Sequence, residues 1–162
     1  MAESLTSKSW KWLANLAPAY RRTGARVTYI ASDFQEVEIQ LPLTWQTRNH
    51  LQMIWGGSLY GAIDPIYGVM LLKLLGDDYY VVDKAATIHF QRPARTRLYA
   101  RFRVDDTELT AIRSLLMTQS KIDRVYRVEL CDLQGKVYAV CEKTVHIRHK
   151  VKPTASLLPV SI

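Results

Sequence analysis

Six segments of the chain are predicted as β-strands, and three of them, residues 26–31, 36–41 and 98–104, alternate between apolar and polar residues with the period of two that a half-buried strand requires. In the clearest example Val37, Ile39 and Leu41 share one face, and polar residues occupy the other. We therefore predict strands at residues 26–31, 36–41, 80–82 leading into 86–91, 98–104, 124–131 and 137–148.

Three other segments have the period of a helix. Residues 4–16 form an amphipathic pattern that ends before Pro18, with Leu5, Trp12, Leu13 and Leu16 on one stripe. Residues 57–75 are apolar nearly all round, which predicts a buried helix, and residues 107–118 follow Asp106 as the expected N-cap. One long buried helix among antiparallel strands predicts an α+β fold, in which a curled antiparallel sheet wraps around a central α-helix.

Composition indicates one ordinary folded domain, since 48% of the 162 residues are hydrophobic and 23% are charged. We expect an N-terminal helical segment at residues 1–24, the main domain at 25–150 and a C-terminal tail at 151–162. The longest apolar run noted, residues 69–75, is broken by Lys73, so we expect no membrane span. No signal-peptide pattern is read at the N-terminus, and we expect a cytoplasmic protein.

The net charge of +7 narrows the possible partners. It fits a solvated basic surface, a small phosphorylated ligand such as coenzyme A, or nucleic acid. The aromatic residues are not interleaved with the basic ones as a single-strand platform would need, so nucleic acid is the least favoured partner.

The two cysteines flank a hairpin turn at residues 132–135. A tight turn would place Cys141 opposite Tyr126 and far from Cys131, beyond the reach of a disulfide. The histidines show no metal-ligand spacing with either cysteine, so we predict no metal site and no cofactor.

One carboxylate lies inside the apolar run that predicts the central helix. Asp64 follows the pair Gly56-Gly57 by seven residues, and a buried carboxylate needs a partner or a task. The free N–H groups of a helix that starts at the glycines can hold a developing negative charge. A carboxylate base or nucleophile together with such donors is the minimum needed to cleave an acyl bond.

The spacing Asn49, six residues, Trp55-Gly56-Gly57 and then Asp64 resembles the active-site segment of hotdog-fold acyl-CoA thioesterases of the phenylacetate-pathway type. The segment from Phe90 to Ala94 resembles the family's aromatic-x-Arg-Pro-Ala strand end, and residues 134–139 resemble its last hairpin. The likeness covers about residues 25–150, and the whole chain looks closest to an uncharacterised branch of this superfamily.

The resemblance implies a hotdog fold and a thioester hydrolase that needs no cofactor beyond the coenzyme A of its substrate. It implies that Asp64 is the general base or nucleophile and that the Gly57 N–H polarises the thioester carbonyl. Asn49 would position the attacking water or the loop before the helix. Since the family's sites form between subunits, it also implies a homodimer or a dimer of dimers.

Two residues depart from the family pattern. Trp55 stands where the family has histidine, so that histidine's polar role is absent and an indole lines or closes the pocket. Pro65 removes a helical N–H, and proline disfavours helical angles at the residue before it. We therefore predict a kink at Asp64, with the Gly61 carbonyl unpaired or bonded elsewhere.

Several further residues are candidates for substrate binding, each with a structural alternative: Trp55, Gly56, Ser58, Tyr60, Arg92 and Arg95. The two arginines suit a phosphate of coenzyme A but can equally be surface groups. Asp83-Lys84 is either a turn with a structural ion pair or part of the pocket mouth. The activity alternative is a protein of the same fold that binds an acyl-CoA or fatty acyl chain without cleaving it.

Overall fold

The structure is a computed structural model, which describes residues 3–150. Its strands form one six-stranded antiparallel sheet in the order β1-β2-β4-β5-β6-β3. The strand bounds are β1 Arg26–Ile30, β2 Glu36–Leu41, β3 Tyr79–Phe90, β4 Leu98–Arg103, β5 Lys121–Cys131 and β6 Val137–His149. The α+β architecture expected from the alternation of apolar residues is confirmed.

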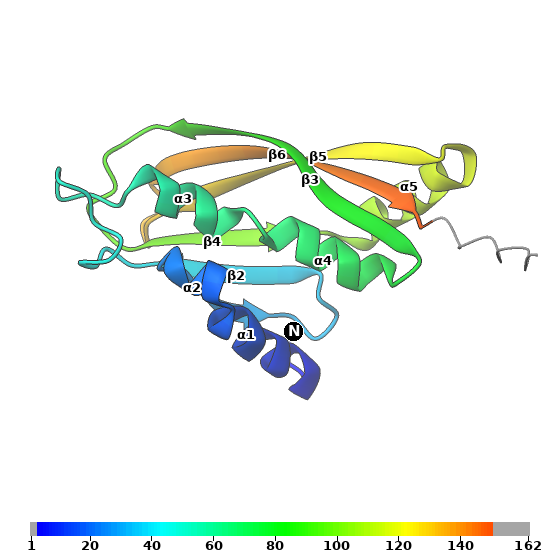
Figure 1. The fold of residues 1–162 in the computed structure, drawn as a ribbon, viewed down its shortest axis with the longest axis horizontal. Coiled ribbons are helices and arrows are strands. Elements are labelled where there is room, and N and C mark those ends of the chain that lie inside the picture. Colours follow the sequence, from blue (N-terminus) through cyan, green and yellow to red (C-terminus); the bar gives the residue numbers. More distant parts are fainter. Residues whose placement is uncertain (1–2, 151–162) are drawn as a thin grey trace, which may run out of the picture.

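The sheet curls around two consecutive helices, α3 (Gly56–Ile63) and α4 (Ile66–Leu75), as Figure 1 shows. The fully buried side chains of Ile63, Met70 and Leu71 on these helices belong to the same core cluster as Phe102 and Ile39 on the strands. Burial of these apolar surfaces is the main driving force that holds the sheet on the helices.

The N-terminal helix α1 (Leu5–Leu16) packs on β1 with a different face from the one predicted. Ser7 is buried, and Trp10 and Ala14 pack against the core, whereas the predicted apolar stripe faces solvent. The orientation is fixed because the Asn15 amide exchanges two hydrogen bonds with the backbone of Val27, at 2.9 and 2.8 Å. Sequence periodicity missed this because a tryptophan and an alanine are enough to anchor the helix.

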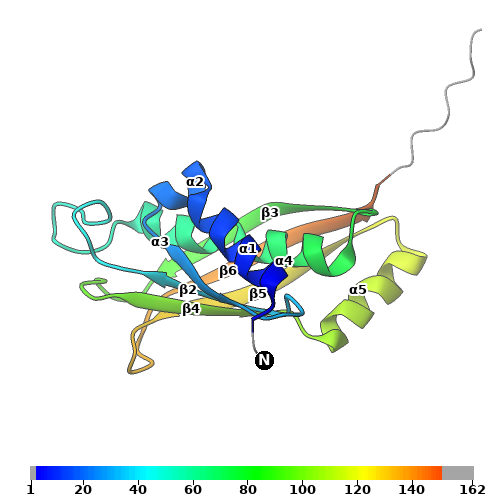
Figure 2. The same ribbon diagram turned by 90° about the horizontal axis from the view of Figure 1, so that it is seen from below.

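Two helices differ in detail from their predictions. Pro18 ends α1 but also begins a short helix that was not predicted, α2 (Pro18–Arg22), since proline suits the first position of a helix. The helix after β4, α5 (Asp106–Thr118), is capped by Asp105 and not by Asp106. The Asp105 carboxylate accepts the Glu108 N–H at 2.8 Å. In Figure 2, α5 lies at one end of the molecule.

Two strand predictions are also corrected. Residues 79–90 form one continuous strand with an irregularity between Asp83 and Ala85, so the expected gap is absent. Cys141 lies opposite Val128 and not opposite Tyr126, because the loop is longer than a tight turn and the ladder shifts between Leu130 and Cys131. The predicted tail at residues 151–162 lies outside the described residues.

The segment Gly56–Leu75 corrects the expectation that no stretch could span a membrane. It is 20 residues long, and an 18-residue window within it has a mean hydropathy of 1.3, so it could cross a membrane by length and composition alone. Half of this window is buried inside the fold, where the segment serves as the core helix. The core helix of a folded domain can satisfy the same criteria of length and hydropathy as a membrane span.

Candidate active site

The start of α3 carries two backbone donors that have no partner within residues 3–150. Trp55 occupies the N-cap, and no side chain caps the helix. The N–H groups of Ser58 and Leu59 donate to the Trp55 carbonyl at 3.0 and 3.1 Å. This leaves the N–H groups of Gly56 and Gly57 unpaired, as expected for the first turn of an uncapped helix. Unpaired N–H groups at a helix start are donors that can hold an anion.

Aromatic rings explain why both positions are glycine. A Cβ atom on Gly57 would lie 2.5 Å from the indole of Trp55, and one on Gly56 would lie 3.2 Å from the ring of Phe90. Trp55, which is 61% exposed, therefore folds over the helix start. The indole covers part of the approach to Gly57.

Asn49 shapes the loop before α3. Its side-chain oxygen accepts the N–H groups of Leu51 and Met53 at 2.9 and 3.3 Å, and its own N–H donates to the Met53 carbonyl at 2.9 Å. Of the two roles considered for Asn49, this geometry supports positioning of the helix-opening loop.

Asp64 is paired with a lysine that the sequence reading did not identify. Lys143, on β6, is completely buried and donates to Asp64 Oδ1 and to Asp83 Oδ2, each at 2.8 Å. It also donates to the Asp64 carbonyl. The three protons of the ammonium group thus have three acceptors. Two carboxylates share one cation, and Asp83 Oδ1 is buried without a hydrogen-bond partner.

The Asp64 carboxylate is held ionised although it is only 43% exposed. Burial raises the pKa of Asp64, but hydrogen bonds from Lys143 and Tyr60, together with the charge of Lys143, outweigh it and bring the pKa below its usual value. Burial, with the hydrogen bond to Asp64, raises the pKa of Tyr60, which keeps the phenol protonated. An ionised carboxylate is the form that a base or nucleophile needs.

The predicted disturbance of the helix at Asp64 is present as an interruption, but Pro65 does not move Asp64 out of helical angles as predicted. The central helix is interrupted at residues 64–65, between α3 and α4. Asp64 keeps helical angles, with φ −47° and ψ −55°, so Pro65 does not displace it from the helical region. The steric preference is overridden because the neighbours Ile63 and Ile66 are both buried in the core.

The remaining predicted residues do not gather around Asp64. Ser58 is buried at 4% exposure, Arg92 donates to the Val137 carbonyl at 2.5 Å, and Arg95 is exposed on the segment between β3 and β4. Leu59 and Ile63, the apolar residues of α3 nearest these positions, are core residues and, within residues 3–150, line no pocket for an acyl chain. An entirely apolar cavity of about 150 Å³ lies instead between α1, α2, α4 and strands β1 and β2.

The alternation along β6 contains the signal for Lys143. Residues 139, 141, 145 and 147 all point inward, and position 143 lies on the same face. A lysine at an inward position predicts a buried acidic partner, since an unpaired buried charge is too costly.

Both residues of the pair Asp83-Lys84 lie within β3 and not in a turn. Lys84 forms an ion pair with Asp123 at 2.5 Å, and Asp83 forms one with the buried Lys143.

A family model described as "Domain of unknown function (DUF4442)" matches residues 7–147. The chain belongs to this family. No curated protein is similar enough in sequence to match it.

Solved structures share the fold of this DUF4442 member. A Pseudomonas aeruginosa protein of unknown function, described as a probable thioesterase, is 21% identical with a TM-score of 0.79, over 91% of this chain and 98% of its own. A thioesterase from Haemophilus influenzae is 14% identical with a TM-score of 0.68, over 93% and 96% of the two chains. A protein of unknown function from Chlorobaculum tepidum is 16% identical with a TM-score of 0.71, over 90% and 95%. These likenesses confirm the predicted hotdog-type fold.

Proposed function

We propose that this protein hydrolyses an acyl thioester such as an acyl-CoA, with Asp64 as general base or nucleophile and the Gly57 N–H as donor to the thioester carbonyl. The observation that carries the proposal is the presence of unpaired N–H groups at Gly56 and Gly57 on the same helical segment as an ionised, half-exposed carboxylate. The shared fold with thioesterases supports the same reaction class.

Within one chain, Asp64 and Gly57 are too far apart to act on the same carbonyl. A helix rises about 1.5 Å per residue, so seven residues separate them by roughly 10 Å along the axis. A base must come within hydrogen-bond distance of the attacking water. The proposed site therefore combines Gly57 of one copy with Asp64 of a second copy.

Strand β3 offers an edge on which two copies can pair in this way. It lies at the end of the sheet, spans 12 residues and exposes Ala85, Ala86 and Thr87 near its middle. An unpaired strand edge is a template for another strand. Phe90 contacts the start of α3, and Asp83 shares Lys143 with Asp64. Antiparallel pairing of two β3 strands would bring the Phe90 end of one copy beside the Asp83 end of the other.

In this arrangement, water and the residues of the protein are sufficient for hydrolysis. The Asp64 carboxylate takes a proton from water, the resulting hydroxide attacks the thioester carbonyl carbon, and the Gly57 N–H stabilises the oxyanion. Collapse of the tetrahedral intermediate breaks the carbon–sulfur bond, and the leaving thiolate takes the proton from Asp64, so that the thiol and the acid are released and Asp64 is ionised again. Loss of one such oxyanion donor costs roughly 3 kcal/mol in other hydrolases. We assign Arg92 and Arg95 to the phosphates of the coenzyme.

The test is steady-state turnover of a panel of acyl-CoAs by the wild type and by Asp64→Asn. Asp83→Asn is the matched control, because it removes the other carboxylate that shares Lys143. We expect turnover to fall at least a hundredfold in Asp64→Asn and to change much less in the control. Equal rates in the wild type and Asp64→Asn would remove Asp64 from the reaction.

The alternative is a protein that binds the acyl thioester without cleaving it. Two observations favour this alternative. The Trp55 indole covers Gly57, and the charge of the Asp64 carboxylate is already compensated by its ion pair with Lys143. Saturable binding of acyl-CoA with no release of free thiol would select this alternative. The homodimer and the cytoplasmic location stay predictions, to be tested by light scattering and by cell fractionation.

A further inference from the structure

We propose that the outer face of α1 docks on an anionic lipid surface. This α1 face consists of four large apolar side chains: Leu5, Trp12, Leu13 and Leu16. Their exposed fractions are 85%, 67%, 59% and 54%. A contiguous exposed apolar patch of this kind marks an interaction surface more often than isolated exposed residues do.

Helix geometry places these side chains together. At 100° per residue, Leu5, Trp12 and Leu16 fall within about 40° around the helix, and Leu13 lies beside them. The opposite side of the helix carries buried Ser7 and the packed Trp10 and Ala14. The α1 face is therefore directed away from the sheet.

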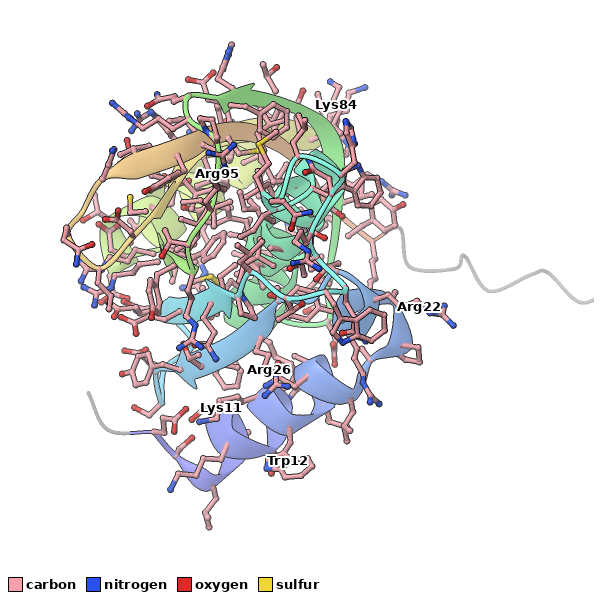
Figure 3. The ribbon with its side chains drawn as sticks, turned by 90° about the vertical axis from the view of Figure 1, so that its left-hand side faces the viewer. Lys11, Trp12, Arg22, Arg26, Lys84 and Arg95 are labelled. Carbon is pink, nitrogen blue, oxygen red and sulfur yellow. The ribbon has the colours of Figure 1, made fainter. Side chains whose placement is uncertain are left out.

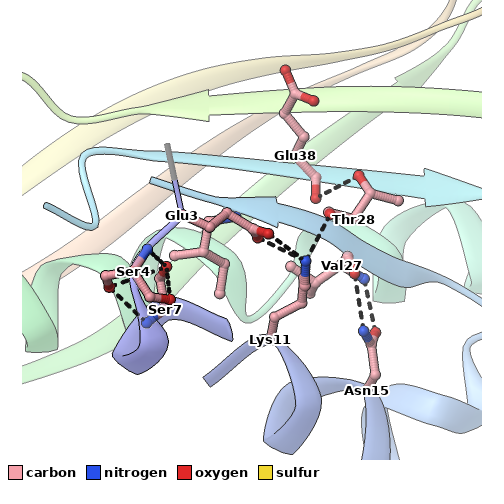
Figure 4. A network of polar contacts seen from close by, with 9 residues as sticks. Glu3, Ser4, Ser7, Lys11, Asn15, Val27, Thr28 and Glu38 are labelled. Atoms are coloured by element: carbon pink, nitrogen blue, oxygen red, sulfur yellow. Dashed lines mark hydrogen bonds and ion pairs between the residues drawn. The ribbon is translucent and has the colours of Figure 1, made fainter. Parts of the chain in front are cut away.

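The outward orientation is a fixed property of the folded state. Ser4 and Ser7 form a capping box at the start of α1, and Asn15 bonds to Val27 near its end. Figure 4 shows these contacts together with the pair between Lys11 and Glu3, at 2.7 Å. Because the helix is held at both ends, its apolar residues cannot turn inward.

The charges around α1 decide which partner fits. Between residues 3 and 29, Glu3 is the only acidic residue, and Lys11 pairs with it. Four basic residues of this segment form no ion pair within the described part of the chain: Lys8, Arg21, Arg22 and Arg26. Figure 3 shows Arg26 beside α1, Arg22 farther along the chain at α2, and Trp12 projecting from the outer side of α1.

A lipid surface suits this combination better than a second copy of the chain. Two copies joined through their α1 faces would bring their basic residues toward one another and would repel. Anionic headgroups neutralise the same residues, while leucine and tryptophan enter the boundary between headgroups and acyl chains. Trp and Leu on one helix face with basic residues beside them is the pattern of helices that lie in a membrane interface.

Co-sedimentation of the full-length protein with lipid vesicles tests the proposal. One vesicle type contains phosphatidylcholine alone, and the other is an equal mixture of phosphatidylcholine and phosphatidylglycerol. We expect binding to the mixed vesicles, at least tenfold weaker binding to phosphatidylcholine, and release by high salt, which screens the charges. Equal binding to both, or binding to neither, overturns the proposal.

Paired variants separate the two contributions. Trp12→Ser with Leu16→Ser removes half of the α1 face, and Arg21→Glu with Arg22→Glu reverses its charge; each is expected to weaken vesicle binding at least tenfold. The matched control is Leu133→Ser, an apolar residue that is 78% exposed on the β5–β6 loop, and it is expected to bind as the wild type does.

Light scattering distinguishes the competing occupant. If Trp12→Ser with Leu16→Ser lowers the molecular mass in solution, the α1 face is covered by a second copy and the lipid proposal is wrong. Circular dichroism checks that the variants remain folded, which is expected because the changed side chains are exposed. None of these outcomes depends on hydrolysis, so the proposal stands or falls separately from the proposed activity.

Discussion

Replacement of Lys143 by methionine tests the buried ion cluster directly. Lys143 is fully buried and is the shared partner of Asp64 and Asp83. Methionine keeps much of the apolar volume but removes the charge and all three donors. Both carboxylate oxygens lie 2.8 Å from the same nitrogen, so they are at most 2 × 2.8 Å = 5.6 Å apart. Without the cation they repel each other.

The expected loss of unfolding free energy is about 3 kcal/mol at neutral pH. Removal of one partner from a buried ion pair costs about 3–5 kcal/mol, because it leaves an uncompensated charge. The lower end applies since Asp64 and Asp83 are 43% and 28% exposed and water partly solvates them. A domain of this size has about 5–15 kcal/mol of stability, so the variant is expected to remain folded.

Urea unfolding at several pH values provides the measurement, with Lys84→Met as the matched control. Lys84 also pairs with an aspartate, Asp123, but is 57% exposed. Exposed pairs contribute about 0–1 kcal/mol, so the control should lose no more than that. The deficit of Lys143→Met should shrink toward pH 4, as protonation of one carboxylate relieves the repulsion.

A triple variant separates the charge effect from packing. Lys143→Met combined with Asp64→Asn and Asp83→Asn has no charge left in the cluster, so it should recover most of the lost stability. If Lys143→Met and Lys84→Met lose the same amount, or if the triple variant is no better than Lys143→Met, the description of a stabilising buried cluster is wrong.

Three further outcomes are expected. The pKa of Asp64 is lowered in the folded state, so its contribution to the unfolding free energy is present above the unfolded pKa of about 4 and is lost as the pH falls through the folded pKa. On acid titration, Asp64→Asn should therefore lose less stability than the wild type. An identical loss in the two proteins would contradict the pairing of Asp64 with Lys143. Gly76→Ala should lower the melting temperature and cost about 1–3 kcal/mol of unfolding free energy, because φ is +93° at this position. Gly68→Ala, within α4, should raise the melting temperature slightly, because alanine favours a helix and the added Cβ meets only ordinary contacts at 3.9 Å. Glu108→Ala should cost about 2 kcal/mol in urea unfolding, because the buried Tyr126 hydroxyl loses its 2.8 Å acceptor; no change would exclude that bond as a stabilising contact.

Alternation and helical period were sufficient to predict the architecture. The strand at residues 36–41 and the end of α4 before Gly76 matched closely, because each has one clear buried face or one clear stop signal. The face of α1 was predicted wrongly, since the predicted apolar stripe is exposed and Trp10 and Ala14 are the residues that pack. Periodicity reports which residues share a face but cannot report which face meets the core.

The candidate site was only half visible in the sequence. Gly56, Gly57 and Asp64 are close along the chain, so their common helix and the interruption at Pro65 could be predicted. Lys143 lies 79 residues beyond Asp64, and the two meet only because β6 lies in the part of the sheet that contacts α3. Long-range contacts of this kind follow from strand order, which one sequence does not specify.

The contact between Lys143 and the Asp64 carbonyl also affects how the central helix is seated. Leucine, isoleucine and methionine contacts tolerate small slides, because one apolar neighbour can replace another. A charged donor with three assigned acceptors tolerates none. Lys143 therefore fixes the position of the central helix along its own axis. It thereby also fixes where the N–H groups of Gly56 and Gly57 lie at the other end of α3.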